Sequence, residues 1–447
     1  MVEPRIVPRE EHPISRRDID PDALKVLYRL RQGEYTAYLV GGSVRDLLLG
    51  RHPKDFDIGT SAHPYQVKKL FRNCWIIGRR FRLAHVKFGQ KVIEVATFRR
   101  QVAAGEEIVQ DGVPAPDPTT PEGEQLIHHD NTFGTPEEDA FRRDFTINAL
   151  AYDIATFSII DFVGGLEDLR AGIVRSIGEP DVRLNEDPVR MIRAIAIAAR
   201  LDFAIEPTLL QSIRRHRREI AKSSLPRLIE EYYKILRQGS AEKAFRQMAE
   251  VGLLEPISME LHKGAADPLW RSLAAVDEYR RQFETTPDTL SNAILLGSLL
   301  VPLGISLHPP RTSHDTDDDE GARSKRPRHP PGPRLGDLPL ARRDVERLRQ
   351  IISLQRRLRD LTASERAQRS LAHRGIFREA LTWMEIHGDS PDVVEHWMGI
   401  LDEHGDAPPP PEEGGGDTDQ PTAAADMPHK RRRRRRRGRR GGGGHAH

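Results

Sequence analysis

The chain has 447 residues, of which 37% are hydrophobic and 30% are charged, and its formal net charge is +2. This length predicts two to four domains with room for a buried core. No apolar run reaches about 18 residues and residues 1–17 lack the apolar stretch of a secretory signal, so we expect no integral membrane contact. The single cysteine, Cys74, lies in an apolar run, which predicts a buried structural thiol, excludes cysteine-bound zinc and fits a cytoplasmic protein.

The first hundred residues predict a mixed α/β unit. Residues 1–20 are expected to form a loose leader. Glycines 41 and 42 indicate a turn, after which Ser43 would cap the helix 44–49. Hydrophobic patterning predicts helices at 21–31, 44–49 and 64–71, and strands at 37–40, 55–58, 74–77, 83–88 and 92–98.

The remainder of the chain is predicted to be mainly helical beyond a long loop at 101–135. The clearest helices are expected at 187–201, 225–236 and 241–254, and a basic helical segment with seven arginines at 338–360. A polar stretch at about 307–335 indicates a disordered linker or insertion. We therefore expect a leader at 1–20, a catalytic head at 21–155, a helical neck at 156–260, a helical arginine-rich domain at 261–405 and a disordered Pro/Gly/Arg-rich tail at 406–447.

The tail carries ten positive charges within eleven residues, so the rest of the chain sums to about −8. A basic block on an acidic body favours an arm that contacts a polyanion such as RNA. The alternative is a disordered tail that only aids solubility. The basic residues are Lys430, Arg431, Arg432, Arg433, Arg434, Arg435, Arg436, Arg437, Arg439 and Arg440.

The first chemical signal is the turn at Gly41 and Gly42, between a predicted strand and a predicted helix. Two glycines let the backbone approach a phosphate, and the start of a helix offers N–H groups to it. Ser43 would add a hydroxyl donor and Arg45 a cation. On its own, such a turn is more often only a turn.

Asp55 and Asp57 strengthen this interpretation because residues i and i+2 of a strand point to the same face. Two carboxylates on one face repel each other unless a cation lies between them, and carboxylates suit Mg²⁺. Phe56 between them would point into the core. The pattern predicts a magnesium site beside the phosphate turn, with a solvated edge strand as the alternative.

A third carboxylate is expected in such a site, and two candidates exist. Glu94 lies in an apolar strand, where an unpaired carboxylate would be costly to bury. Asp144 follows two arginines. Either one could instead belong to a structural ion pair.

A helix beginning near Pro188 carries Asp187, Arg190 and Arg193 at intervals of three residues, which places them on one face. The rest of this helix is almost entirely apolar, so we expect these charges to line a cleft. There they could offer an acceptor and donors to the edge of a nucleobase. The alternative is an Asp187–Arg190 salt bridge.

Four ordered motifs resemble a known family: Gly41-Gly42-x-Val44-Arg45-Asp46, Asp55-x-Asp57, Arg143-Asp144-x-x-x-Asn148-Ala149 and Glu186-Asp187-x-x-Arg190. The chain is identified by them as similar to the class II nucleotidyltransferases of the polymerase-β superfamily, which contain bacterial poly(A) polymerases and tRNA CCA-adding enzymes. The resemblance implies an α/β head with a mixed sheet, followed by helical neck and body domains.

The same resemblance implies roles for these residues. Asp55 and Asp57 would be catalytic and would bind two Mg²⁺ ions, with Glu94 or Asp144 as the third acid. The residues implied for the nucleotide are Gly41, Gly42, Ser43 and Arg45 at the triphosphate, Arg143 and Asn148 near the ribose, and Asp187, Arg190 and Arg193 at the base. An RNA 3′-hydroxyl would then attack the α-phosphate of ATP and release pyrophosphate, without a template.

Within the family, residues 78–86, residues 130–135 and the arginine-rich C-terminal part resemble the poly(A) polymerases. We therefore expect a monomeric poly(A) polymerase that binds ATP and the 3′ ends of mRNA and other transcripts, because an arginine arm gives sequence-independent phosphate contacts. The first alternative is a CCA- or A-adding tRNA nucleotidyltransferase. A less favoured one is a non-catalytic RNA-binding protein.

Overall fold

The computed structural model describes residues 3–78, 82–100, 132–307 and 332–404. The expected loop at 101–135, the polar stretch at 307–335 and the basic tail fall wholly or largely outside these ranges. In the described part of the chain, no helix is both long and apolar enough to cross a bilayer.

The N-terminal part is built on an eight-stranded sheet in the order β1-β8-β7-β2-β3-β6-β5-β4. Only β3 and β6 pair in parallel among these strands. The sheet is therefore mixed, as expected. The strands are β1 Arg5–Val7, β2 Ala37–Val40, β3 Asp57–Thr60, β4 Cys74–Ile77, β5 Leu83–Phe88, β6 Lys91–Thr97, β7 Ala151–Asp153 and β8 Ser158–Asp161.

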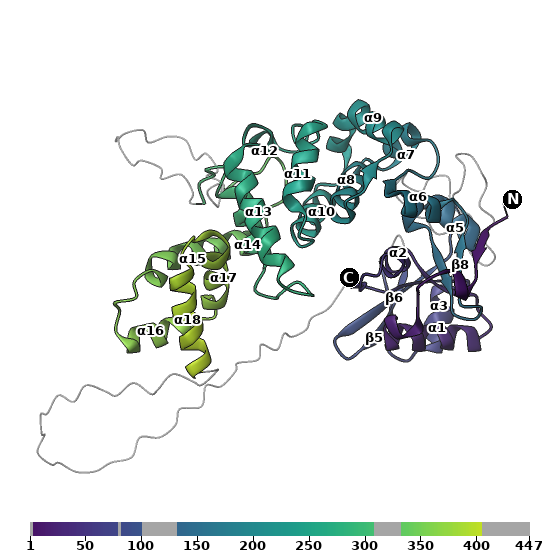
Figure 1. Ribbon diagram of the computed structural model, residues 1–447, viewed down its shortest axis with the longest axis horizontal. Helices are drawn as coiled ribbons and strands as arrows, with labels where there is room; N and C mark the ends of the chain where they lie inside the picture. Colours follow the sequence, from purple (N-terminus) through teal and green to yellow (C-terminus); the bar gives the residue numbers. More distant parts are fainter. Residues whose placement is uncertain (1–2, 79–81, 101–131, 308–331, 405–447) are drawn as a thin grey trace, which may run out of the picture. The chain divides into compact units, whose positions relative to one another are not determined.

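One face of this sheet is covered by α1 (Pro21–Gln32) and α3 (Pro64–Leu70) (Figure 1). Alternate strand residues point to these helices and are buried, among them Cys74, Val86 and Ile58. Helix α1 starts at Asp20, whose carboxylate accepts the backbone N–H groups of the first turn, as a helix start requires. The predicted strands and helices of this region are found, although the strand predicted at 55–58 and the helix predicted at 44–49 have shifted bounds. The predicted burial of Cys74 is confirmed.

The sheet also uses residues outside the expected head. Strand β1 lies within residues 1–20, which we expected to be loose, and pairs with β8 from Arg5 opposite Asp161. Strand β8 itself lies beyond residue 155. Residues 1–20 contribute an ordered strand because β8 offers them an unpaired edge. The expected limits of the domains remain a prediction.

Helices dominate the rest of the described chain. They are α5 Pro136–Arg142, α6 Gly165–Ala171, α7 Pro180–Glu186, α8 Val189–Leu201, α9 Pro207–His216, α10 Leu225–Leu236, α11 Ala241–Glu250, α12 Met259–Lys263, α13 Asp267–Arg281, α14 Asn292–Leu300, α15 Arg342–Leu358, α16 Glu365–Ala372, α17 Phe377–His387 and α18 Pro391–His404. A two-stranded parallel sheet, β9 (Ile173–Val174) with β10 (Ala204–Ile205), lies among them.

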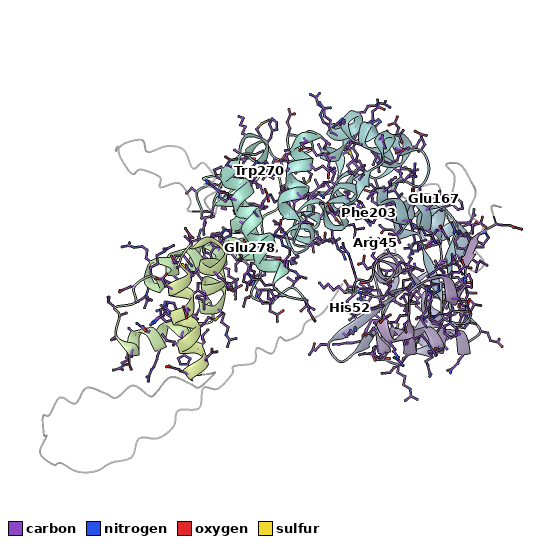
Figure 2. The ribbon with its side chains drawn as sticks, viewed as in Figure 1. Arg45, His52, Glu167, Phe203, Trp270 and Glu278 are labelled. Atoms are coloured by element: carbon purple, nitrogen blue, oxygen red, sulfur yellow. The ribbon has the colours of Figure 1, made fainter. Side chains whose placement is uncertain are left out.

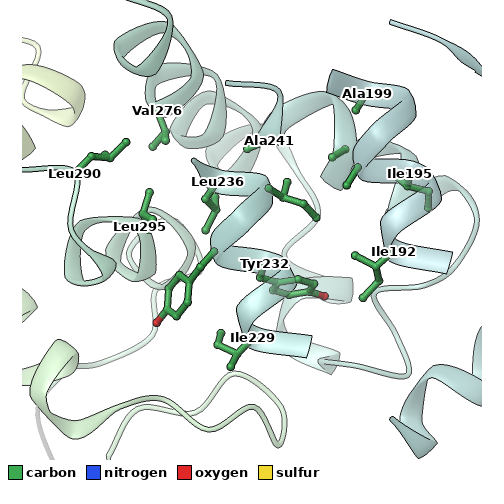
Figure 3. Close-up of a cluster of buried hydrophobic side chains, with 14 of the residues drawn as sticks. Ile192, Ile195, Ala199, Ile229, Tyr232, Leu236, Ala241, Val276, Leu290 and Leu295 are labelled. Carbon is green, nitrogen blue, oxygen red and sulfur yellow. The ribbon is translucent and has the colours of Figure 1, made fainter. Parts of the chain in front are cut away.

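The apolar face of α8 forms a core with α10, α11, α13 and α14 (Figure 3). Ile192 and Ile195 of α8 and Tyr232 of α10 are fully buried there. Because a residue before proline avoids helical geometry, Asp187 is extended, with φ −143° and ψ 91°, and separates α7 from α8. This packing fixes the direction of the polar start of α8, which carries the predicted base-reading residues.

Candidate active site

The turn between β2 and α2 (Gly42–Leu48) is built around Gly41, which adopts φ +78°. This left-handed conformation favours glycine. A Cβ at residue 41 would also lie 2.9 Å from Nη1 of Arg143, so a larger residue would displace that guanidinium. The two glycines therefore bring the backbone and Arg143 close together at the edge of a cleft.

Ser43 does not cap α2, contrary to our expectation. Gly41 occupies the N-cap position, and the Ser43 hydroxyl is buried and donates to the carbonyl of Val40 at 3.1 Å. The helix starts earlier than predicted because Gly42 accepts helical geometry directly after the turn. Ser43 thus uses its donor inside the protein and is not among the residues that line the cleft.

Arg45, which is labelled in Figure 2, is buried and forms a network with Asp46 and Asn148. Its Nε and Nη2 donate to Oδ1 of Asp46 at 2.8 and 2.7 Å, and its Nη1 donates to Oδ1 of Asn148 at 2.5 Å. Burial lowers the pKa of Arg45, and Asp46 opposes this effect. Because these partners take much of its donor capacity, Arg45 mainly holds the turn against the loop that carries Asn148.

Asp144 lies next to this network and is also buried. Its Oδ1 accepts from the backbone N–H of Phe145 and from Nδ2 of Asn148, and its Oδ2 forms a 2.7 Å ion pair with Arg193. The same pairing raises the pKa of Arg193. This environment is that of a structural ion pair that joins the loop to α8.

Asp57 opens strand β3 and lies beside Glu94 of β6, because β3 and β6 run in parallel with Ile58 opposite Val95. A pocket of about 560 Å³ is lined by Asp55, Asp57 and Glu94 together, with His85 at 3.5 Å from Glu94. Asp55 precedes the strand, which starts two residues later than we predicted, while Phe56 packs into the core as expected. Sequence and topology thus bring three carboxylates to one pocket.

Glu94 is not buried, contrary to what its apolar neighbours indicated. Half of its side chain, 50%, is accessible to solvent, because Glu94 lies on the open face of β6 while Ile93 and Val95 face the core. Its position beside Asp57, together with the ion pair of Asp144, favours Glu94 over Asp144 as the third acid.

The surroundings of Asp57 disfavour its charged form. Loss of hydration raises the pKa of Asp57 to about 6, with further increases from Glu94 and Asp55 that Arg143 partly offsets. Crowded carboxylates of this kind fit a divalent cation, whose charge would favour their ionised forms. In the described ranges no three Asp, Glu, His or Cys side chains form a ready ligand set. This open arrangement suits Mg²⁺, which takes many of its ligands from water and phosphate.

Asp187 and Arg190 flank the junction of α7 and α8, but they do not pair with each other. Arg227 of α10 donates to both carboxylate oxygens of Asp187, at 3.1 and 2.9 Å. Arg190 donates to the Arg183 carbonyl and to Glu186. The expected alternative of an Asp187–Arg190 salt bridge is therefore wrong, because Arg227, forty residues further along the chain, holds the acid instead.

A buried arginine connects this junction to the loop before it. Nη2 of Arg183 donates to the backbone carbonyls of Arg142 and Arg143, both at 2.8 Å, and its Nη1 pairs with Glu186 at 2.7 Å. Arg183 thereby positions Arg143 and Asp144. The sequence motifs gave no signal for this role.

All these elements surround one cleft of about 600 Å³. Ten of the predicted residues line it: Gly41, Gly42, Arg45, Asp57, Arg143, Asp144, Asn148, Asp187, Arg190 and Arg193. Sequence reasoning missed Arg99, Asp139, Arg142, Arg200, Glu231, Lys234 and Gln238, which also line it. Eight arginines and lysines face five aspartates and glutamates there, so the lining is suited to a polyphosphate.

A mixed sheet with a glycine turn, a carboxylate group beside it and a cationic cleft defines a nucleotidyltransferase. Three family models agree: "Poly A polymerase head domain" matches residues 37–175, "Probable RNA and SrmB- binding site of polymerase A" matches 202–264, and "Polymerase A arginine-rich C-terminus" matches 334–440. The three matches run through most of the chain and place it in the poly(A) polymerase family.

Individual relatives give the degree of similarity. The chain is 50% identical over 253 residues to poly(A) polymerase I of Salmonella typhi, which covers 56% of this chain and 53% of that protein. It is 37% identical over 235 residues to the CCA-adding enzyme of Lactobacillus johnsonii, covering 53% of this chain and 54% of that one. The matches thus span about half the length of these curated relatives.

A solved structure extends the likeness of the fold. The CCA-adding enzyme of Bacillus stearothermophilus, crystallised in complex with CTP, aligns with a TM-score of 0.53 and 26% identity, over 86% of this chain and 83% of that one. The likeness in fold therefore extends over more of this chain than the sequence matches to the curated relatives do.

Proposed function

We propose that this protein is a template-independent polynucleotide adenylyltransferase that transfers AMP from ATP to RNA 3′ ends and releases pyrophosphate. The observation that carries the proposal is the cleft, which Asp57 and Asp187 line together with eight arginines and lysines. The identity of 50% to a poly(A) polymerase, against 37% to a CCA-adding enzyme, favours poly(A) addition.

The residues of the chain would divide the work as follows. Gly41, Gly42 and Arg143 would hold the triphosphate, and Arg190 would contact the base beside Asp187. The acids that would hold Mg²⁺ are Asp55, Asp57 and Glu94. When bound, the metal would activate the attacking hydroxyl and neutralise the charge that develops on the leaving pyrophosphate.

Binding of RNA would use the helical domains and the basic tail, residues 430–440. The tail lies outside the described residues, so its role rests on its charge. Deletion of residues 430–447 should weaken RNA affinity and reduce the dependence of that affinity on salt. If the RNA affinity and its dependence on salt do not change, the tail does not bind RNA and only aids solubility.

The proposal is tested by supplying each NTP in turn with a generic RNA and with a tRNA that lacks its CCA end. Long adenylate tails on generic RNA are the expected result. Addition that stops after CCA on the tRNA would favour the CCA-adding alternative, which the likeness to the Bacillus enzyme supports.

The catalytic centre is tested with Asp55→Ala and Asp57→Ala. Both variants should lose incorporation and keep RNA binding, because the acids would hold metal rather than RNA. Glu278→Gln, at an exposed position of α13, is the matched control and should keep full activity. Normal incorporation by either Asp variant would refute this catalytic centre. No incorporation by the wild-type protein with any NTP would favour the non-catalytic interpretation.

A further inference from the structure

The open face of the sheet carries a second feature that the site above does not use. Burial alternates along β4, β5 and β6, so Trp75, His85 and Glu94 share the face opposite α1 and α3. The strand register places Trp75 opposite His85 and His85 opposite Glu94. Asp57 continues the row on β3. A tryptophan and the proposed catalytic acids therefore lie in one row across the sheet.

Trp75 is unusual among the tryptophans of this chain. Its side chain is 53% exposed, whereas Trp270, Trp383 and Trp397 are buried. Ile77, the next residue of β4 on the same face, is 51% exposed. Apolar side chains gathered beside an active site indicate a contact surface more strongly than single exposed residues do.

Two pockets meet at Asp57. The cleft with Asp187 and Arg190 contains the proposed nucleotide residues. The pocket with Asp55, Glu94 and His85 reaches from Asp57 to His85, the β5 residue that lies opposite Trp75. In an in-line transfer the attacking hydroxyl and the leaving pyrophosphate lie on opposite sides of the α-phosphate. The second pocket is therefore the side from which an RNA 3′ end would reach Asp57.

The distance and charge also fit RNA. Trp75 lies three strands from Asp57, about 14 Å at the spacing of paired strands, which corresponds to about four stacked nucleotides. Lys54 lines the second pocket, and Lys87 lies on the open face of β5. Exposed aromatic rings accept any base by stacking, and neighbouring lysines attract phosphates.

We propose that Trp75, with Ile77 beside it, is a stacking platform for a base of the RNA a few nucleotides upstream of the 3′ end. This inference rests on the proposed function, since it requires an RNA 3′ end at Asp57. Stacking would hold the RNA without selecting its sequence, as repeated addition to varied ends requires. Trp75 acts as a binding and positioning residue and takes no part in the chemical step.

The first test is intrinsic fluorescence of the full chain with an oligoadenylate, without ATP or Mg²⁺. Because the other three tryptophans are buried, RNA should quench and shield mainly Trp75. Quenching should disappear in Trp75→Phe. Quenching that persists in Trp75→Phe, or no quenching in the wild type, would overturn the proposal. This readout does not require catalysis, so it separates failure of the platform from failure of the proposed function.

The second test is kinetic. Trp75→Ala should raise the KM for RNA about 5- to 150-fold, the range expected for loss of one stacked base, and leave the KM for ATP unchanged. Trp75→Phe should restore most of the RNA affinity. Tyr65→Ala removes a similarly exposed aromatic side chain from α3, on the opposite side of the sheet, and should have no effect. An unchanged KM for RNA in Trp75→Ala would refute RNA as the occupant. A change in oligomeric state without a change in the KM for RNA would point to a second copy of the chain as the occupant and refute the proposal too.

Discussion

Nη2 of Arg200 in α8 lies 2.6 Å from Oδ2 of Asp46 in α2, although 154 residues separate them in the sequence. The other oxygen of Asp46 accepts from Arg45. Asp46 therefore joins the glycine turn to the helix that carries Arg193.

Replacing Arg200 with Met should destabilise the fold by about 1–2 kcal/mol, because the buried carboxylate of Asp46 would lose one charged partner while Arg45 remains. Arg200 is itself about one-third exposed, which limits the effect. Thermal or urea unfolding measures the loss. Lys25→Met removes an exposed ion pair and should change stability by less than about 0.5 kcal/mol. Equal effects of the two variants would contradict the role of Asp46.

Activity should depend on the ionisation of Asp57. Its pKa is raised to about 6, so the carboxylate takes up a proton as the pH falls through that value. A protonated Asp57 cannot bind metal, and kcat/KM should therefore fall below about pH 6. Higher Mg²⁺ should move this acidic limb to lower pH, because the metal competes with the proton. A limb that is insensitive to Mg²⁺ would show that another group controls the profile.

Gly41→Ala should lower both stability and ATP affinity. The substitution strains a residue at φ +78° and places a methyl group 2.9 Å from Arg143, so a cost of about 2–3 kcal/mol is expected. Gly50→Ala is the matched control, because Gly50 has φ +67° but no atoms within 4 Å of its would-be Cβ. Unfolding and the KM for ATP compare the two. If the two variants have the same stability and the same KM for ATP, the contact between residue 41 and Arg143 does not contribute to either.

Arg227→Gln should relax the choice of nucleotide. In the structure both oxygens of Asp187 are engaged by Arg227, which leaves Arg190 to offer donors to the base. Without Arg227 the Asp187 carboxylate would lose its fixed position beside the base, so the ratio of kcat/KM for ATP over CTP should fall about tenfold, the scale of one hydrogen bond to a charged group. Arg218→Gln, at an exposed position, is the control. An unchanged ratio would mean that the Asp187–Arg227 pair does not select the base.

Local patterns predicted much of this architecture. The alternation in β4 to β6 and the proline and aspartate at the start of α1 depend on neighbours within a few residues, and these elements were found as expected. The exposure of Glu94 could also have been predicted from the strand alternation, because Val92, Glu94 and Ala96 share one face. The apolar composition of the segment obscured that signal.

Pairings between distant residues could not be predicted in this way. The partners of Asp46, Asp144 and Asp187 come from α8 and α10, and their choice depends on how these helices pack. A sequence motif identifies each of these aspartates but does not identify the arginine that pairs with it. For the same reason the motif could not distinguish a metal-binding Asp144 from one joined to Arg193.

Arg183 has a consequence for how successive nucleotides are added. Its guanidinium donates to two consecutive carbonyls at the end of α5, so a hinge opening there would cost both bonds and leave the buried cation with Glu186 as its partner. The joint between the nucleotide cleft and α7 is therefore stiff. We therefore expect the cleft and α7 to keep one relative position during each round of synthesis, while the RNA moves relative to both.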